Sequence, residues 1–249
     1  MTAVFKREFK SYFTTPVGYI FLAAFYFFLG LYFYMIYASG SPEIGAVIIS
    51  TYSVAVFAMP VITMRMMSDD RRQKVDQALI TAPVKLSGIV LGKFFAAFSV
   101  FALAFAPTVI FEIIIASKVS VNILSYIYPL LGVLLLGGAL IAIGMFISSL
   151  TESPAISAIL TLVINILVLY MSNFASMVTV PEGSETFFGK IWAGIVSAFA
   201  SFLEKAGFIT VVENFASNVF SVVDVVYFLS IIAVFIFLSV RSLEKRRWS

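Results

Sequence analysis

The stretch VGYIFLAAFYFFLGLYFYMIYASGSP, residues 17–42, contains 26 residues without a charged side chain. A bilayer core about 30 Å thick needs roughly 20 helical residues, so this stretch is long enough to cross a membrane. A secretory signal has a shorter apolar core followed by a small-residue cleavage site. We therefore interpret residues 17–42 as containing a retained membrane span.

Five further stretches with few or no charges follow along the chain. The six predicted spans are Gly18 to Tyr37, Gly45 to Met64, Ile89 to Ile115, Ser125 to Leu150, Ala155 to Val178 and Val222 to Val240. Pro107 predicts a kink in the third span, and Pro60 predicts another near the end of the second. With 61% hydrophobic and only 12% charged residues, the chain is predicted to be an all-α, polytopic membrane protein with six transmembrane helices. We expect one domain, residues 1–249.

The composition excludes several classes of catalytic and metal site. The chain has no cysteine and no histidine, so disulfides, thiolate or imidazole metal ligands, and catalytic groups built on those side chains are excluded. Gly92 and Lys93 have neither the spacing of a phosphate-binding loop nor a following Ser or Thr. We expect no enzymatic activity, metal or cofactor in this chain.

The positive charges predict the orientation in the membrane. Thirteen of the 16 lysines and arginines lie at the two ends and in alternate gaps between spans, whereas the other gaps hold only Lys118, Lys190 and Lys205. Because positively charged loops remain cytoplasmic, both termini are predicted to be cytoplasmic.

The N-terminal segment has the pattern of an amphipathic helix. Its aromatic stripe consists of Phe5, Phe9, Tyr12 and Phe13, and its cations are Lys6, Arg7 and Lys10. This pattern predicts a helix over residues 2–13, within a segment 1–16, whose aromatic side faces acyl chains and whose cations face lipid head groups. The alternative is a disordered basic tail that only fixes the topology.

The loop between the second and third spans, residues 65–88, has the features of a charged helix over residues 68–82. Ser68 is suited to cap it, and Asp69 and Asp70 fall in its first turn, where the helix dipole favours acids. The next cytoplasmic loop is only residues 151–154, so a partner is expected to dock on residues 68–82. The alternative is a solvated helix whose charges serve only topology.

Outside these segments, an aromatic pattern and two intramembrane polar residues stand out. In residues 179–221, Phe188 and Trp192 belong to a helical pattern that predicts short outer helices, with an interfacial aromatic belt as the alternative. Asn165, near the middle of the fifth span, is expected to hydrogen-bond another helix. Glu112, toward the outer end of the third span, either faces a cavity or reaches the membrane interface.

Four motifs resemble the permease subunits of type-2 ABC exporters, with the nearest resemblance to the subgroup associated with bacterial gliding motility and nitrous-oxide-reductase maturation. The motifs are YFTTPVGYIF (12–21), SDDRR (68–72), DQALITAPV (76–84) and IVLGKF (89–94). The resemblance in span count and topology covers the whole chain. Many members have a glutamate and a Gly-Thr pair in the second cytoplasmic segment, where this chain has residues 73–77, QKVDQ.

The resemblance implies a role for each exposed segment. Residues 1–16 would be an elbow helix, residues 68–82 a coupling helix seated on an ATPase, and residues 179–221 an outer gate. The implied coupling residues are Ser68, Asp69, Asp70, Arg71, Arg72, Lys74, Asp76 and Leu79. The elbow residues are Phe5, Lys6, Arg7, Phe9 and Lys10, and the pathway or gate residues are Glu112, Asn165, Phe188 and Trp192.

The expected function is that of an exporter permease in a bacterial inner membrane. Two permeases, identical or related, would assemble in lipid over two cytoplasmic ATPase subunits that bind ATP and Mg²⁺, with no nucleic-acid partner. One alternative is an ABC-linked scaffold or mechanical transmitter that acts on a periplasmic partner without moving solute. Another is a gradient-driven carrier dependent on Glu112, although paired polar sites at midplane, which such carriers ordinarily show, are not found.

Overall fold

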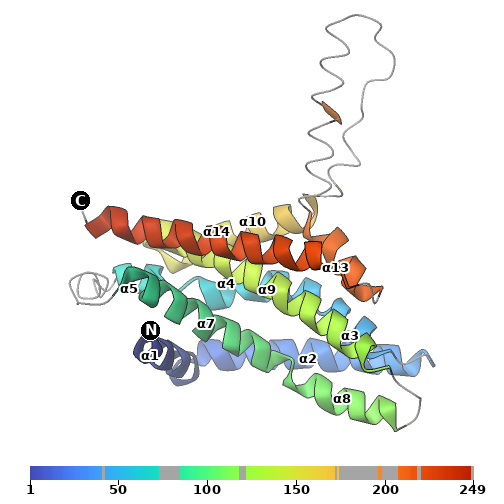
Figure 1. Cartoon of the computed structure of the whole chain (residues 1–249). Coiled ribbons are helices and arrows are strands. Elements are labelled where there is room, and N and C mark those ends of the chain that lie inside the picture. Colours follow the sequence, from blue (N-terminus) through green and yellow to red (C-terminus); the bar gives the residue numbers. More distant parts are fainter. Residues whose placement is uncertain are drawn as a thin grey trace, which may run out of the picture.

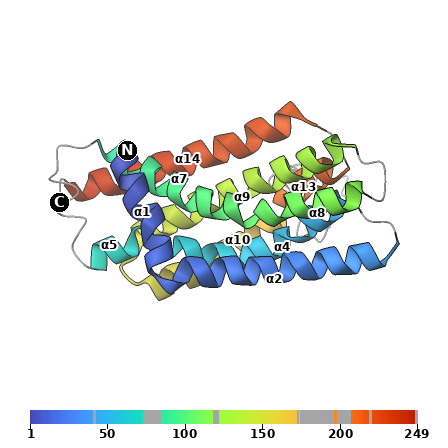
Figure 2. The same cartoon turned by 90° about the horizontal axis from the view of Figure 1, so that it is seen from below.

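The computed structural model describes residues 1–40, 43–72, 85–117, 122–171, 173, 196–197, 207–217 and 220–247. Within these ranges all regular secondary structure is helical. The long helices lie roughly along one direction and form a bundle, and α1 (Thr2–Thr14) crosses one end of it (Figures 1 and 2). We call this the α1 end of the bundle.

The remaining helices follow the predicted order. They are α2 (Pro16–Ala38), α3 (Ile44–Ser50), α4 (Tyr52–Thr63), α5 (Ser68–Arg72), α7 (Leu86–Ala104), α8 (Ala106–Ala116), α9 (Leu124–Leu150), α10 (Pro154–Leu169), α13 (Phe208–Ala216) and α14 (Val222–Arg247).

Among the described residues, four segments are long and apolar enough to cross a membrane: α2, α7 with α8, α9 and α14. The bent pair of α3 and the α4 segment makes a fifth. Helix α10 forms most of the predicted fifth span, Ala155 to Val178. Residues 172 and 174–178 of that span lie outside the described residues. The described part of the chain is thus all-α, with four segments suited to a membrane, or five if the bent pair is one span.

Helix α9 forms the centre of the bundle and packs against α3, α4, α7, α10, α13 and α14 (Figure 1). Most of its side chains are buried, and its glycines permit close approach. A Cβ atom at Gly137 would overlap the Phe101 ring of α7, and one at Gly144 would overlap Thr63 of α4. Small residues therefore allow the helices around α9 to pack at short distance.

The predicted kink in the third span is found next to its proline, whereas the second span bends away from its proline. The break between α7 and α8 is at Phe105, two residues before Pro107. Pro107 has no N–H for the Leu103 carbonyl, which accepts a hydrogen bond from the Tyr26 hydroxyl at 3.2 Å instead.

The second span bends by 43° between α3 and α4, at Thr51 and not at Pro60. The Thr51 hydroxyl donates to the Ile48 carbonyl at 2.5 Å. A bond of this type from side chain to backbone competes with the regular helical pattern, and here it lies at the bend.

Candidate functional site

At the α1 end of the bundle, a buried lysine joins three helices. The Lys93 Nζ atom of α7 lies 2.8 Å from Asp70 Oδ2 of α5 and 3.1 Å from Glu8 Oε1 of α1. The Lys93 side chain is only 2% exposed. A buried charge is costly unless it is paired, so these two carboxylates hold α1 and α5 to α7 at one point. Figure 2 shows α1 crossing α7 at this end of the bundle, with α5 beside α1.

A glycine brings α1 close enough to α7 for this contact. A Cβ atom at Gly92 would lie 3.1 Å from the Met1 carbonyl oxygen and 3.1 Å from the Val4 side chain. The two backbones are therefore nearly in contact one residue before Lys93. Glu8, one helical turn after Val4, is brought to the lysine by this packing.

Glu8 also binds the neighbouring arginine of α1. Arg7 Nη2 lies 2.5 Å from Glu8 Oε1. Burial opposes the charged form of Arg7, but the hydrogen bond and charge of Glu8, with the charge of Asp70, outweigh burial and raise the pKa of Arg7. Glu8 is thus shared between two cations.

Tyr12 anchors the other half of α1. Its hydroxyl donates a hydrogen bond to the Ile62 carbonyl near the end of α4, at 3.2 Å. Burial, helped by the negative charge of Glu8, raises the pKa of Tyr12. The phenol therefore remains a hydrogen-bond donor at physiological pH.

The start of α5 is held by a serine of α9. Ser148 Oγ accepts hydrogen bonds from the backbone N–H groups of Met67 and Ser68, each at 3.1 Å, and donates to the Met64 carbonyl at 3.1 Å. The prediction that Ser68 caps this helix is wrong. Ser68 is the first residue of α5, and its hydroxyl turns back to the Met64 carbonyl, so Ser148 satisfies the free N–H groups instead.

The side chain of Arg71 links α5 to the turn between α9 and α10. Its Nη1 donates to the Leu150 carbonyl at 3.1 Å, and its Nη2 lies 2.9 Å from Glu152 Oε1. We name the set Glu8, Asp70, Arg71, Lys93 and Ser148 the α5 junction. Through it, α5 is bonded to α7, α9 and the turn before α10, and Lys93 links it to α1.

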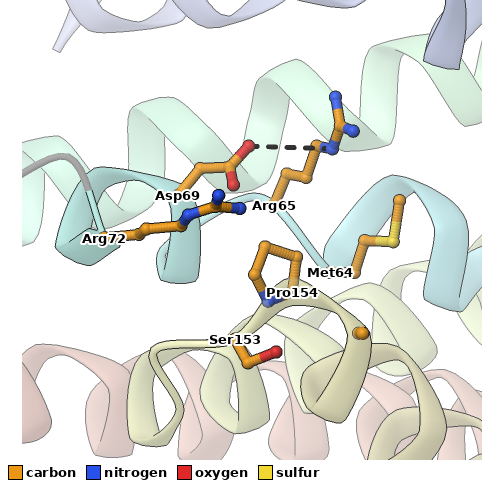
Figure 3. Close-up of a pocket in the computed structure, with 7 residues that line it drawn as sticks. Met64, Arg65, Asp69, Arg72, Ser153 and Pro154 are labelled. Atoms are coloured by element: carbon orange, nitrogen blue, oxygen red, sulfur yellow. Dashed lines mark ion pairs between the residues drawn. The ribbon is translucent and has the colours of Figure 1, made fainter.

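Two pockets flank α5. The larger, of about 630 Å³, is lined by Met64, Arg65, Asp69, Arg72, Ser153, Pro154 and Ala155. Figure 3 shows the ion pair of Arg65 and Asp69, 3.7 Å apart, over the start of α10. The smaller pocket, of about 390 Å³, lies between α1 and the end of α4 and shares Arg65 and Asp69 with the larger one.

The predicted amphipathic helix α1 is confirmed, but its aromatic side is partly covered by protein. Phe5 and Phe9 stack with ring centroids 5.8 Å apart, and Phe9, Tyr12 and Phe13 pack against the core of the bundle. Lys6 and Lys10 are exposed. The aromatic stripe thus attaches α1 to the bundle, a contact that the prediction of an acyl-chain-facing stripe did not include.

The other predicted site residues do not gather at the junction. Glu112, on α8, has one buried carboxylate oxygen without a hydrogen-bond partner among the described residues. Asn165 is fully buried, and neither atom of its amide makes the predicted interhelical bond within this part of the structure. Lys74, Asp76, Leu79, Phe188 and Trp192 lie outside the described residues.

Glu8, Lys93, Ser148 and Glu152 were not identified as site residues from the sequence. Two signals were available in the sequence. Lys93 interrupts the apolar pattern of the third span, and Glu8 is an acid among the N-terminal cations. The sequence has no comparable signal for Ser148, because one serine in an apolar helix is ordinary. A scan against models of known protein families found no match, and a search of curated proteins found no significant sequence similarity.

Proposed function

We propose that this chain is the permease subunit of an ABC exporter and that the α5 junction receives the movement of a separate ATPase. The observation that carries this proposal is the bonding of α5. One short charged helix is tied to α1, α7 and α9 by a buried lysine and a buried serine. A displacement of α5 is therefore passed to several helices at once.

The side of α5 that remains available carries charge. Arg72 is exposed, and Asp69 and Arg65 border the larger pocket beside it. Charged rims of this kind favour a partner with complementary charges. The surface formed by Arg65, Asp69 and Arg72 is the proposed docking surface for the ATPase.

The sequence supplies the remaining support. The charge distribution supports a cytoplasmic location for the α1 end, where ATP is available. No phosphate-binding loop is found in the chain, so hydrolysis takes place in the partner. The resemblance to type-2 exporter permeases adds a second permease copy, or a related subunit, in a bacterial inner membrane.

The mechanism follows from differential binding. ATP-driven closure of two ATPase subunits favours one position of α5 over the other, and this difference shifts the permease between its conformations. Because Lys93 and Ser148 connect α5 to α7 and α9, the shift becomes a movement of packed helices. Residues 1–16 act as an elbow helix, and residues 179–221 form the outer gate of the proposed export path.

The test is permease-stimulated ATP hydrolysis by the co-purified ATPase. The double variant Asp69→Lys with Arg72→Glu reverses two charges of the docking surface, and we expect it to lower stimulation by at least about tenfold. The matched control is Arg241→Glu with Glu244→Lys, which reverses an exposed ion pair of α14 and, like the test variant, leaves the net charge unchanged. Unchanged stimulation in the Asp69 and Arg72 variant, with normal membrane insertion, refutes the docking surface.

A further inference from the structure

The larger pocket beside α5 has an excess of positive charge. Its charged lining consists of Arg65, Asp69 and Arg72. Arg65 and Asp69 are 3.7 Å apart, a looser ion pair than the 2.8 Å contact of Lys93 with Asp70. Within the described residues, Arg72 forms no ion pair. One of the two guanidinium groups of this pocket is therefore available to an anion.

The first turn of α10 completes the polar lining of the pocket. Ser153, Pro154 and Ala155 line it there, and in Figure 3 the Arg72 side chain extends toward Arg65 above Pro154. The Ser153 hydroxyl does not cap α10, so it can donate to a ligand. Guanidinium and hydroxyl donors around one pocket match the oxygens of a phosphate group.

The pocket lies where the chain passes from a charged turn into an apolar helix. The Glu152 side chain, two residues before α10, is 70% exposed, whereas α10 itself contains no charged residue. The predicted fifth span begins at Ala155, so in the predicted orientation this turn is at the cytoplasmic surface of the membrane. Basic pockets between helices at that surface bind the head groups of anionic lipids.

An exposed apolar stripe leads from the pocket along α10. Ala155 is exposed and lines the pocket, and Ile159, Val163 and Leu167 follow it at intervals of four residues. These three larger side chains are 63%, 48% and 48% exposed. At 1.5 Å per helical residue the stripe is about 18 Å long, close to the roughly 15 Å of hydrocarbon in one leaflet. The pocket and the stripe thus offer adjoining positions for a head group and an acyl chain.

We propose that this pocket binds the head group of an anionic phospholipid, with one acyl chain along Ile159, Val163 and Leu167. The guanidinium groups of Arg65 and Arg72 bind the phosphate oxygens. A choline lipid offers the same phosphate but adds a cation, which the two arginines repel. The site therefore selects anionic phospholipids over choline lipids.

The lipid site does not require the ATPase of the proposed function, although both use Arg65 and Arg72. An arginine has five N–H donors in a planar fork, so one side chain can bind a phosphate toward α10 and an acidic group of a partner. The test uses the purified full-length chain without any ATPase. Its outcome is therefore independent of permease-stimulated ATP hydrolysis, which tests the docking surface.

Short-chain lipids provide the probes. They are dioctanoyl phosphatidylglycerol, which is anionic, dioctanoyl phosphatidylcholine, which is zwitterionic, and glycerol phosphate, which is a soluble anion. Dissociation constants are measured in a neutral detergent from the ligand-dependent rise in Tm. We expect phosphatidylglycerol to bind at least about tenfold more tightly than either of the other two. Equal binding of the two lipids overturns the selection of an anionic head group, and equal binding of glycerol phosphate overturns the assignment to a lipid.

Removal of the two guanidinium groups locates the site. Arg65→Gln with Arg72→Gln is expected to weaken binding of phosphatidylglycerol by at least about tenfold. The matched control is Arg241→Gln with Lys245→Gln, which removes two exposed cations of α14 and is expected to leave the dissociation constant unchanged. Unchanged binding in the Arg65 and Arg72 variant, or an equal loss in the control, refutes this pocket as the site.

The apolar stripe gives a second, independent measurement. Ile159→Ser with Val163→Ser is expected to weaken binding of phosphatidylglycerol by about fivefold, because the acyl chain loses apolar contact. The matched control is Val109→Ser with Ile113→Ser on α8, where the two side chains are 51% and 64% exposed. Equal affinities in these two double variants refute the position of the acyl chain on α10.

Discussion

The Lys93 ammonium lies 2.8 Å from the Asp70 carboxylate. This contact fixes the short helix α5 to α7, which belongs to a segment long and apolar enough to cross a membrane. Glu8 completes the arrangement from α1 at 3.1 Å. The three elements come from separate parts of the chain and share one buried cation. The stability of the α1 end and the position of α5 therefore depend on the same side chain.

Replacement of Lys93 by methionine is expected to destabilise the protein by about 3–5 kcal/mol, because the largely buried Asp70 carboxylate loses its ion-pair partner and Glu8 keeps only Arg7. The measurement is thermal or denaturant unfolding of the purified protein. The control adds Asp70→Asn to Lys93→Met, which removes the unpaired charge and is expected to recover most of the loss. A single Lys93→Met variant as stable as the wild type contradicts the structural role of the ion network.

Replacement of Ser148 by alanine is expected to cost about 1–3 kcal/mol, because the N–H groups of Met67 and Ser68 lose their acceptor. Amide hydrogen exchange at these two residues is the specific measurement, and it should become faster. Ser99→Ala is the matched control, since the Ser99 hydroxyl donates to the Phe95 carbonyl of its own helix. Unaltered exchange at residues 67 and 68 would show that Ser148 does not hold α5.

A larger side chain at Gly92 is expected to separate α1 from α7. Gly92→Leu adds atoms against the Met1 carbonyl and Val4, and overpacking of this kind costs about 1–3 kcal/mol. The distance between spin labels on α1 and α7 reports the separation. Gly30→Leu is the control because a Cβ at Gly30 has no neighbour within 4 Å. Identical label distances in the two variants would exclude close packing at Gly92.

Tyr12 is expected to make the stability of the folded protein sensitive to alkaline pH. Its pKa is raised in the folded protein by burial and by Glu8, so the folded state retains the proton to higher pH than the unfolded chain does. This contribution to stability is complete below about pH 10, the ordinary tyrosine value, and is lost as pH rises above it, by at most about 1.4 kcal/mol per unit. The unfolding free energies of the wild type and Tyr12→Phe should run parallel below pH 10 and converge above it. Curves that stay parallel to higher pH contradict the assignment.

Much of the helical architecture was predictable from local pattern. The charge-free stretch from residue 17 corresponds to α2, and the predicted fourth and sixth spans correspond to α9 and α14. The length of each apolar stretch and the position of the charges beside it determine these helices, so the local sequence is sufficient to predict them. The bend at Thr51 was not predictable in this way, because any Ser or Thr in an apolar helix can bond its own backbone.

The sequence by itself determined the all-helical class, the apolar segments, the amphipathic α1 and the charged start of α5, because hydrophobicity and helix signals act over a few residues. Only the tertiary structure decided that Lys93 pairs with Glu8 and Asp70, that Ser148 holds α5, and that Ser157, Thr161 and Asn165 face inward without partners. The contacts of Lys93 and Ser148 join residues that are distant in the chain. The inward position of the three polar residues depends on which side of α10 faces α9. Helix packing makes that choice, through the close approach that Gly92 and Gly144 permit.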